Sequence, residues 1–102
     1  MLESIEKYKE LGINDFKLRD LDDIEKIYGM KPENTPGYDE LPEDRKEIFR
    51  GFFLNFFNSW GLDARVNMKP KSVEVDGDYL KFVFDYYEMV NTITVVNANG
   101  WR

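Results

Sequence analysis

The segment from Pro42 to Gly61 constrains the fold most, because it carries a band of aromatic side chains at helical spacing. Four of them fall within an arc of about 60° when successive residues turn by about 100°: Phe49, Phe53, Phe56 and Trp60. Three more apolar residues widen the band to about half of the circumference: Ile48, Phe52 and Phe57. So broad an apolar face must be covered by other elements, and we expect a sheet on one flank and two helices on the other.

The ends of this long helix have recognisable signals. Pro42 suits the first helical position, and Glu43 and Asp44 suit the first turn, where carboxylates interact favourably with the helix dipole. Gly61 suits the end. Gly51 lies opposite the aromatic band and costs about 1 kcal/mol relative to alanine, which leaves room for a close packing contact there.

Two shorter helices are predicted before the long one. Apolar residues at helical spacing predict a first helix over residues 2–11, with Gly12 as its stop. A second helix is predicted over residues 21–28, with Asp20 as its N-cap and Gly29 at its end. Residues 30–41, with two prolines and a glycine, are predicted to form a loop.

After Gly61 the period of the apolar residues changes from helical to alternating, which predicts β-strands. The alternation covers residues 62–68, 73–75 and 80–86, and a last strand is expected over residues 92–96. We expect a turn over residues 69–72 that pairs Met68 with Val73. A two-residue turn within 76–78 is expected to pair Val75 with Leu80.

These elements predict one α+β domain over residues 1–102. Three N-terminal helices are followed by an antiparallel meander of three to four strands, with the long third helix packed on the sheet. The core material is sufficient, since 42% of the residues are hydrophobic and 16% are aromatic.

The sequence lacks most of the side chains that catalyse reactions. It contains no histidine and no cysteine, which removes the commonest general base, the thiol nucleophile and the commonest zinc ligands. We therefore expect no catalytic residues, no cofactor and no enzyme activity. A carboxylate-dependent hydrolase is the remaining catalytic alternative, although Asp76 and Asp78 flank a turn glycine. Asp85, on the outward face with Lys81, is expected to pair with a residue of a neighbouring strand.

Metal binding and direct binding to nucleic acid are not expected either. Neither the aspartates at 20–23 nor the acids at 39–44 match the spacing of a calcium loop. The net charge is −6, and residues 1–50 hold 14 acidic against 9 basic side chains. Nucleic-acid binding requires clustered cations, and the only basic patch expected is small: Arg65, Lys69 and Lys71. Modest acidity is also what keeps many small domains in solution.

The acidic residues predict a protein partner with a basic surface. The expected partner-binding residues form two clusters along the chain: Asp20, Asp22, Asp23, Glu25, and Asp39, Glu40, Glu43, Asp44, Glu47. A third cluster contains Glu74, Asp76 and Asp78. Carboxylates on a rigid frame can imitate a phosphate backbone, so the preferred function is an acidic inhibitor or adaptor that docks on a basic, nucleic-acid-binding protein. Interleaved cations weigh against this, because Glu43 with Lys46 and Glu47 with Arg50 have the spacing of ordinary helix-surface pairs.

No stretch of the chain matches a family motif. The chain is similar in size and charge to small acidic inhibitors of phages and mobile elements, including anti-CRISPR and antirestriction proteins. That similarity is compositional, and it assigns no site residues.

The alternative function is a homo-oligomeric structural or accessory protein that associates through the outer face of the sheet. Tyr79, Val83 and Tyr87 are the expected surface for a homodimer, and Tyr38 and Trp101 are also expected to be exposed. The acidic N-terminus has no signal-peptide pattern, and no apolar run is long enough for a membrane span. We expect a cytoplasmic, soluble protein without membrane contact.

Overall fold

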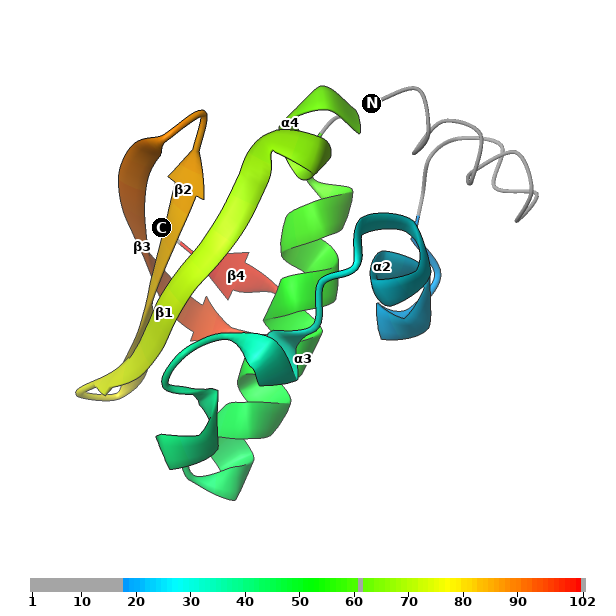
Figure 1. Ribbon diagram of the computed structural model, residues 1–102. Helices are drawn as coiled ribbons and strands as arrows, with labels where there is room; N and C mark the ends of the chain where they lie inside the picture. Colours follow the sequence, from blue (N-terminus) through cyan, green and yellow to red (C-terminus); the bar gives the residue numbers. More distant parts are fainter. Residues whose placement is uncertain (1–17, 61, 102) are drawn as a thin grey trace.

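The computed structural model describes residues 18–60 and 62–101, and it shows an α+β fold (Figure 1). Its helices and 3-10 turns are α2 (Leu21–Tyr28), η1 (Pro32–Asn34), η2 (Tyr38–Glu40), α3 (Glu43–Asn58) and α4 (Leu62–Asn67). The strands are β1 (Met68–Asp76), β2 (Tyr79–Tyr86), β3 (Met89–Asn97) and β4 (Gly100–Trp101). The predicted fold class is therefore confirmed: three helices precede an antiparallel sheet. The helix predicted over residues 2–11 lies outside the described residues.

The four strands form one antiparallel meander in the order β1-β2-β3-β4. Val75 pairs with Leu80 and Asp76 with Tyr79, which confirms the predicted two-residue turn and its register. Gly77 supplies the left-handed conformation that such a turn requires, with φ of +62°. Strand β3 (Met89–Asn97) is longer than the segment predicted for it, residues 92–96. The short strand β4 was not predicted.

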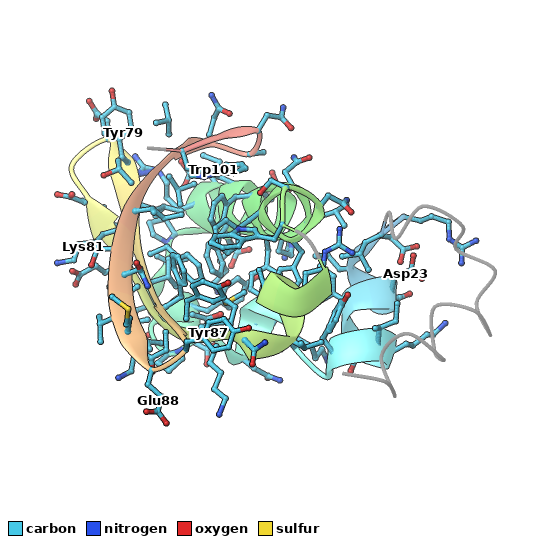
Figure 2. The ribbon with its side chains drawn as sticks, turned by 90° about the horizontal axis from the view of Figure 1, so that it is seen from above. Asp23, Tyr79, Lys81, Tyr87, Glu88 and Trp101 are labelled. Carbon is cyan, nitrogen blue, oxygen red and sulfur yellow. The ribbon has the colours of Figure 1, made fainter. Side chains whose placement is uncertain are left out.

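The long helix α3 packs across one face of the sheet, as its aromatic band predicts (Figures 1 and 2). The ring of Phe82 on β2 lies 5.5, 5.4 and 5.6 Å from the rings of Phe49, Phe52 and Phe56. All four side chains are buried. Both views place α2 on the side of α3 away from the sheet, so α3 is the middle of three layers. The buried Ile24 and Ile27 of α2 belong to the same core.

The signals predicted for α2 are also confirmed. The carboxylate of Asp20 accepts a hydrogen bond from the Asp23 N–H at 3.1 Å. At the other end Gly29 has φ of +70° and donates its N–H to the Glu25 carbonyl. Residues 30–41 form the predicted loop, which contains η1 and η2. This loop is fixed to β1, because Val73 donates its N–H to the Pro36 carbonyl at 2.9 Å.

The strand predicted over residues 62–68 is wrong, because residues 62–67 form helix α4. Ala64 and Met68 are both buried. Residues four apart share a face in a strand and in a helix, so a short alternation does not distinguish the two. Arg65 decides for the helix: its buried guanidinium donates through Nε to the carbonyls of Phe57 (2.7 Å) and Trp60 (3.0 Å), near the end of α3.

The turn predicted over residues 69–72 is also wrong. Strand β1 runs through this segment, and Met68 pairs with Tyr86 instead of Val73. A bulge between Pro70 and Ser72 inserts one residue, which brings Met68 and Val73 to the same face although their numbers differ in parity. The proline is tolerated because β1 is an edge strand.

The turn between β3 and β4 is held against α3 by two residues. Asn55 donates through Nδ2 to the carbonyl of Ala98 at 3.0 Å and to Oδ1 of Asn99 at 2.7 Å. A Cβ added to Gly51 would lie 2.7 Å from the Cβ of Ala98. The glycine in the middle of α3 is therefore explained by this close approach.

We predict that Gly51→Ala lowers the free energy of unfolding by about 1–3 kcal/mol, because the added methyl group overpacks the contact with Ala98. Helix propensity alone predicts the opposite sign, a gain of about 1 kcal/mol. Chemical denaturation measures the change. Ala98→Gly in the Gly51→Ala background should restore most of the loss, and an unchanged or increased stability of the single variant would contradict the contact.

Candidate partner-binding surface

Helix α2 contributes less to an exposed acidic surface than its sequence predicts. Asp23 is only 3% exposed, and its carboxylate accepts hydrogen bonds from the Arg19 N–H at 2.8 Å and from Arg19 Nε at 3.4 Å. Asp20 caps the helix, and Glu25 lies 3.5 Å from Lys31. Asp23 is therefore a structural side chain that closes the start of α2. Of this cluster, Asp22 alone is exposed without a hydrogen bond or ion pair to any described residue.

The second cluster is partly neutralised. The predicted pair of Glu43 with Lys46 is present at 3.4 Å, and Asp44 lies 3.7 Å from Arg45. The predicted pair of Glu47 with Arg50 is absent from the described residues. Arg50 donates instead to the hydroxyl of Tyr38 at 3.0 Å. Three exposed carboxylates of this cluster have no ion pair within the described part of the chain: Asp39, Glu40 and Glu47.

Tyr38 was predicted to be exposed and is buried, with 5% of its surface accessible. Its ring lies 6.2 Å from that of Phe49, and the ammonium of Lys46 lies 5.6 Å from the ring centroid. With the hydrogen bond from Arg50, these contacts anchor η2 on the first half of α3. The cationic groups of Lys46 and Arg50 therefore both lie against Tyr38, a neutral side chain that does not cancel their charges.

The third cluster lies on the turn between β1 and β2. Asp76 and Asp78 are exposed and have no ion pair among the described residues, whereas Glu74 lies 3.2 Å from Lys81. Figure 1 shows this turn, η2 and the start of α3 at the same end of the molecule, away from α2. The fold thus gathers the unpaired carboxylates of two sequence clusters at one end. We call this set the acidic end: Asp39, Glu40, Glu47, Asp76 and Asp78.

A groove of about 500 Å³ runs through the acidic end, between the loop that contains η2 and the edge of β1. Its lining combines apolar residues with two carboxylates: Pro36, Gly37, Glu40, Leu41, Ser72, Val73, Glu74 and Val75. Val75 is 45% exposed although it pairs with the buried Leu80. We call this hollow the edge groove.

The outer face of the sheet does not present one apolar patch. Tyr79 and Tyr87 lie at opposite ends of β2, and Figure 2 shows their side chains far apart. The residues on either side of Val83 along this face are charged and ion-paired, Lys81 with Glu74 at 3.2 Å and Asp85 with Lys71 at 3.6 Å. Tyr87 lies in the turn after β2 and accepts a hydrogen bond from Asn67 at 2.9 Å, so it faces the side of α4.

The turn between β2 and β3 carries Tyr87, whose exposure was predicted, and two exposed apolar residues that were not predicted, Met89 and Val90. Tyr87 and Glu88 have φ of 50° and 67°, a conformation that glycine and asparagine adopt more readily. Met89 is 70% exposed, Val90 63% and Tyr87 52%. We call these three residues the apolar tip. The sequence has no Asn-Gly pair here to mark a two-residue turn. The position of the turn therefore could not be predicted, nor could the apolar residues that it exposes.

Two other predicted surface residues are at least half-buried. Trp101 packs its ring 5.5 Å from Phe52 and 5.8 Å from Phe56, and Figure 2 shows it directed toward α3. Arg65 is buried as described above, and Lys71 pairs with Asp85. The pair of Asp85 with Lys71 joins β2 to β1, which confirms the cross-strand pair expected for Asp85. The basic patch predicted for Arg65, Lys69 and Lys71 is reduced accordingly.

The described residues offer little support for metal or acid–base chemistry. Within residues 18–60 and 62–101, no group of three or more acidic side chains is placed to hold a metal ion. The edge groove contains Glu40 and Glu74, and a hollow of about 570 Å³ near the apolar tip contains Asp85 and Glu88. One carboxylate of each pair is engaged by a lysine. A carboxylate-dependent hydrolase gains no support from this geometry.

Comparison with protein-family models, characterised proteins and solved structures finds no significant match to this chain. In the part of the chain that the structure describes, no helix combines the length and apolarity needed to cross a membrane.

We predict that Asp23→Ala and Asp22→Ala have clearly different effects on stability, although both remove one carboxylate from α2. Loss of the buried Asp23 should lower the free energy of unfolding by about 1–2 kcal/mol, since it leaves the Arg19 N–H without its partner. Loss of the exposed Asp22 should change it by less than about 0.5 kcal/mol. Thermal or chemical unfolding of both variants measures the difference, and equal effects would contradict the structural role of Asp23.

Proposed function

We propose that this protein is a non-enzymatic binding module whose acidic end docks on a basic surface of a partner protein. Nucleic-acid-binding proteins are the partner class with the most pronounced surfaces of this kind. The protein then acts as an inhibitor or adaptor that occupies a site otherwise used by phosphate groups.

The observation that carries this proposal is the imbalance between carboxylates and available cations at the acidic end. Its five carboxylates have no ion pair among the described residues. Two of the three cations on α3 are paired with other carboxylates, Lys46 with Glu43 and Arg45 with Asp44. The third, Arg50, donates to the neutral hydroxyl of Tyr38 and keeps its charge. Five carboxylates without an ion pair in the described part of the chain, against one such guanidinium on α3, leave a net negative charge at this end.

Such an arrangement favours electrostatic steering. Uncompensated charges of one sign speed the encounter with a surface of opposite sign. The attraction between exposed charges decays over a Debye length of about 8 Å at physiological ionic strength, so the association should weaken as salt is added. A partner that normally holds DNA or RNA in a basic groove offers several cations within that reach.

We predict that neutralising the acidic end weakens capture of basic partners by roughly tenfold. The test variant carries D39N, E40Q, D76N and D78N. Each exposed charge contributes a few tenths of a kcal/mol, and four together approach the roughly 1.4 kcal/mol that corresponds to tenfold. The immobilised protein is exposed to a cell extract at low and at high salt, and the retained proteins are quantified by mass spectrometry.

A matched control carries D22N, E25Q, E33Q and E88Q, which change the net charge equally but lie outside the acidic end. The control should retain the same basic proteins at low salt as the unaltered protein, and high salt should release them. Equal loss in both variants would show a general charge effect, and equal retention in both would contradict the proposed surface.

Self-association is a second candidate function, and the apolar tip is the observation that favours it. Exposed Met89 and Val90 lie side by side in sequence next to Tyr87, at one end of the sheet. Exposed apolar groups of this kind mark contact surfaces in many proteins. The tip replaces the outer sheet face as the surface for a homodimer, because ion pairs flank Val83 on that face.

If the apolar tip joins two copies, the average mass of the protein should rise with concentration, and M89K with V90T should abolish the rise. Light scattering over a range of concentrations measures this. Tyr79→Ser, at the far end of β2, serves as the control and should associate like the unaltered protein. A constant monomer mass for the unaltered protein would contradict self-association through the tip.

A further inference from the structure

The edge of β1 is covered along only part of its length. The Pro36 carbonyl accepts a hydrogen bond from the Val73 N–H at 2.9 Å. At this one position the loop before α3 pairs with β1 as an additional strand would. Gly37 makes this approach close, since a Cβ at its position would collide with the carbonyl oxygen of Val73. Beyond Val73, toward the turn at Gly77, no element of the described chain pairs with this edge.

The register identifies the backbone groups that are left open. In an antiparallel ladder, successive residues point their N–H and C=O groups alternately toward and away from the paired strand. The Val73 N–H points away from β2, because it reaches Pro36. Val75 follows two residues later without an intervening bulge, so its N–H and C=O also point away from β2. Within the described residues, neither group has a backbone hydrogen-bond partner.

These open groups face the edge groove, and Val75 itself forms part of the lining. The Val75 side chain lies on the inner face with Leu80, while Glu74 and Asp76 project from the outer face. The opposite wall is formed by Leu41 and Glu40. The groove thus combines a free strand edge, an apolar floor and carboxylates on both sides.

We propose that an extended segment of the partner pairs with β1 at Val75 and extends the sheet by one strand. The segment places an apolar side chain beside Val75 and Leu41. Its neighbours on either side are basic, because they lie next to Glu74 and Asp76 on the outer face. This inference rests on the proposed function and adds the partner's local structure: a β-strand of alternating basic and apolar residues.

Charge complementarity selects this occupant over a second copy of the chain. Two β1 edges placed together would bring Glu74, Asp76 and Asp78 of one copy next to the same residues of the other. Like charges directly opposite each other destabilise strand pairing. A basic segment would instead place cations next to these carboxylates. Asp76, which has no ion pair among the described residues, would then form one with the partner.

The test measures amide hydrogen exchange by NMR in the unaltered protein, with and without the peptide acetyl-Arg-Val-Arg-Val-Arg-amide. Exchange of the Val75 amide should slow at least tenfold at saturating peptide, because its open N–H becomes hydrogen-bonded. The Glu74 amide, which already points toward β2, serves as the internal control and should change little. A peptide of the same composition in the order Val-Val-Arg-Arg-Arg should protect Val75 much less.

Each outcome decides between the claims. Binding of the alternating peptide without protection of Val75 overturns the added strand but leaves the acidic end as a docking surface. Absence of peptide binding also overturns the added strand, and the capture experiment with the acidic-end variant then decides the proposed function separately. Protection of Val75 that grows with protein concentration in the absence of peptide would show a second copy on this edge and would likewise overturn the inference.

Two variants at Val75 give an independent check. Val75→Pro removes the open N–H on an edge strand that already contains Pro70, whereas Val75→Ala keeps the N–H and shortens the side chain. Circular dichroism establishes that both variants fold. We expect the proline variant to bind the alternating peptide at least tenfold more weakly and the alanine variant only a few-fold more weakly. Equal affinities of the two variants would overturn the backbone pairing.

Discussion

The contact between the aromatic band of α3 and the inner face of the sheet is the interaction on which the rest of the structure depends. The ring centroid of Phe82 lies 5.4–5.6 Å from those of three rings of α3, and all three contacts have edge-to-face or tilted geometry. Because α3 begins at the end where β1 turns into β2, the acidic start of the helix lies beside the acidic hairpin turn.

Features that neighbouring residues determine could be predicted from the sequence, whereas features that depend on contacts between distant segments could not. The limits of α2, the start of α3 to within one residue and the turn at Gly77 follow from local signals and agree with the structure. Helix α3 ends at Asn58, before the stop predicted at Gly61. Helix α4 and the bulge at Pro70 depend on tertiary contacts. The guanidinium of Arg65 selects the helix, and the docking of residues 36–37 on β1 accompanies the continuous edge strand. Short alternating segments carry no information about either contact.

The candidate surface also combines features that could be predicted from the sequence with features that could not. Sequence spacing showed which segments are acidic, but it could not show which carboxylates have structural roles. Asp23 is buried and closes a helix start, whereas Asp39 and Asp76 remain exposed. Their elements lie at the same end of the molecule because the chain reverses direction between η2 and β1, which no local pattern predicts. The edge groove is likewise invisible in the sequence, because it lies between residues that are more than thirty positions apart.

The strand order has a kinetic consequence. Each strand pairs with the one that directly precedes or follows it, and the turns at 77–78, 87–88 and 98–99 each contain two residues. Closing such short loops costs little chain entropy, so the sheet can assemble by successive hairpins without waiting for a distant segment. Mixed domains of helices and strands fold at rates between those of helical bundles and of all-β barrels. The aromatic core closes only when α3, which precedes the whole sheet in the chain, docks on the assembled strands.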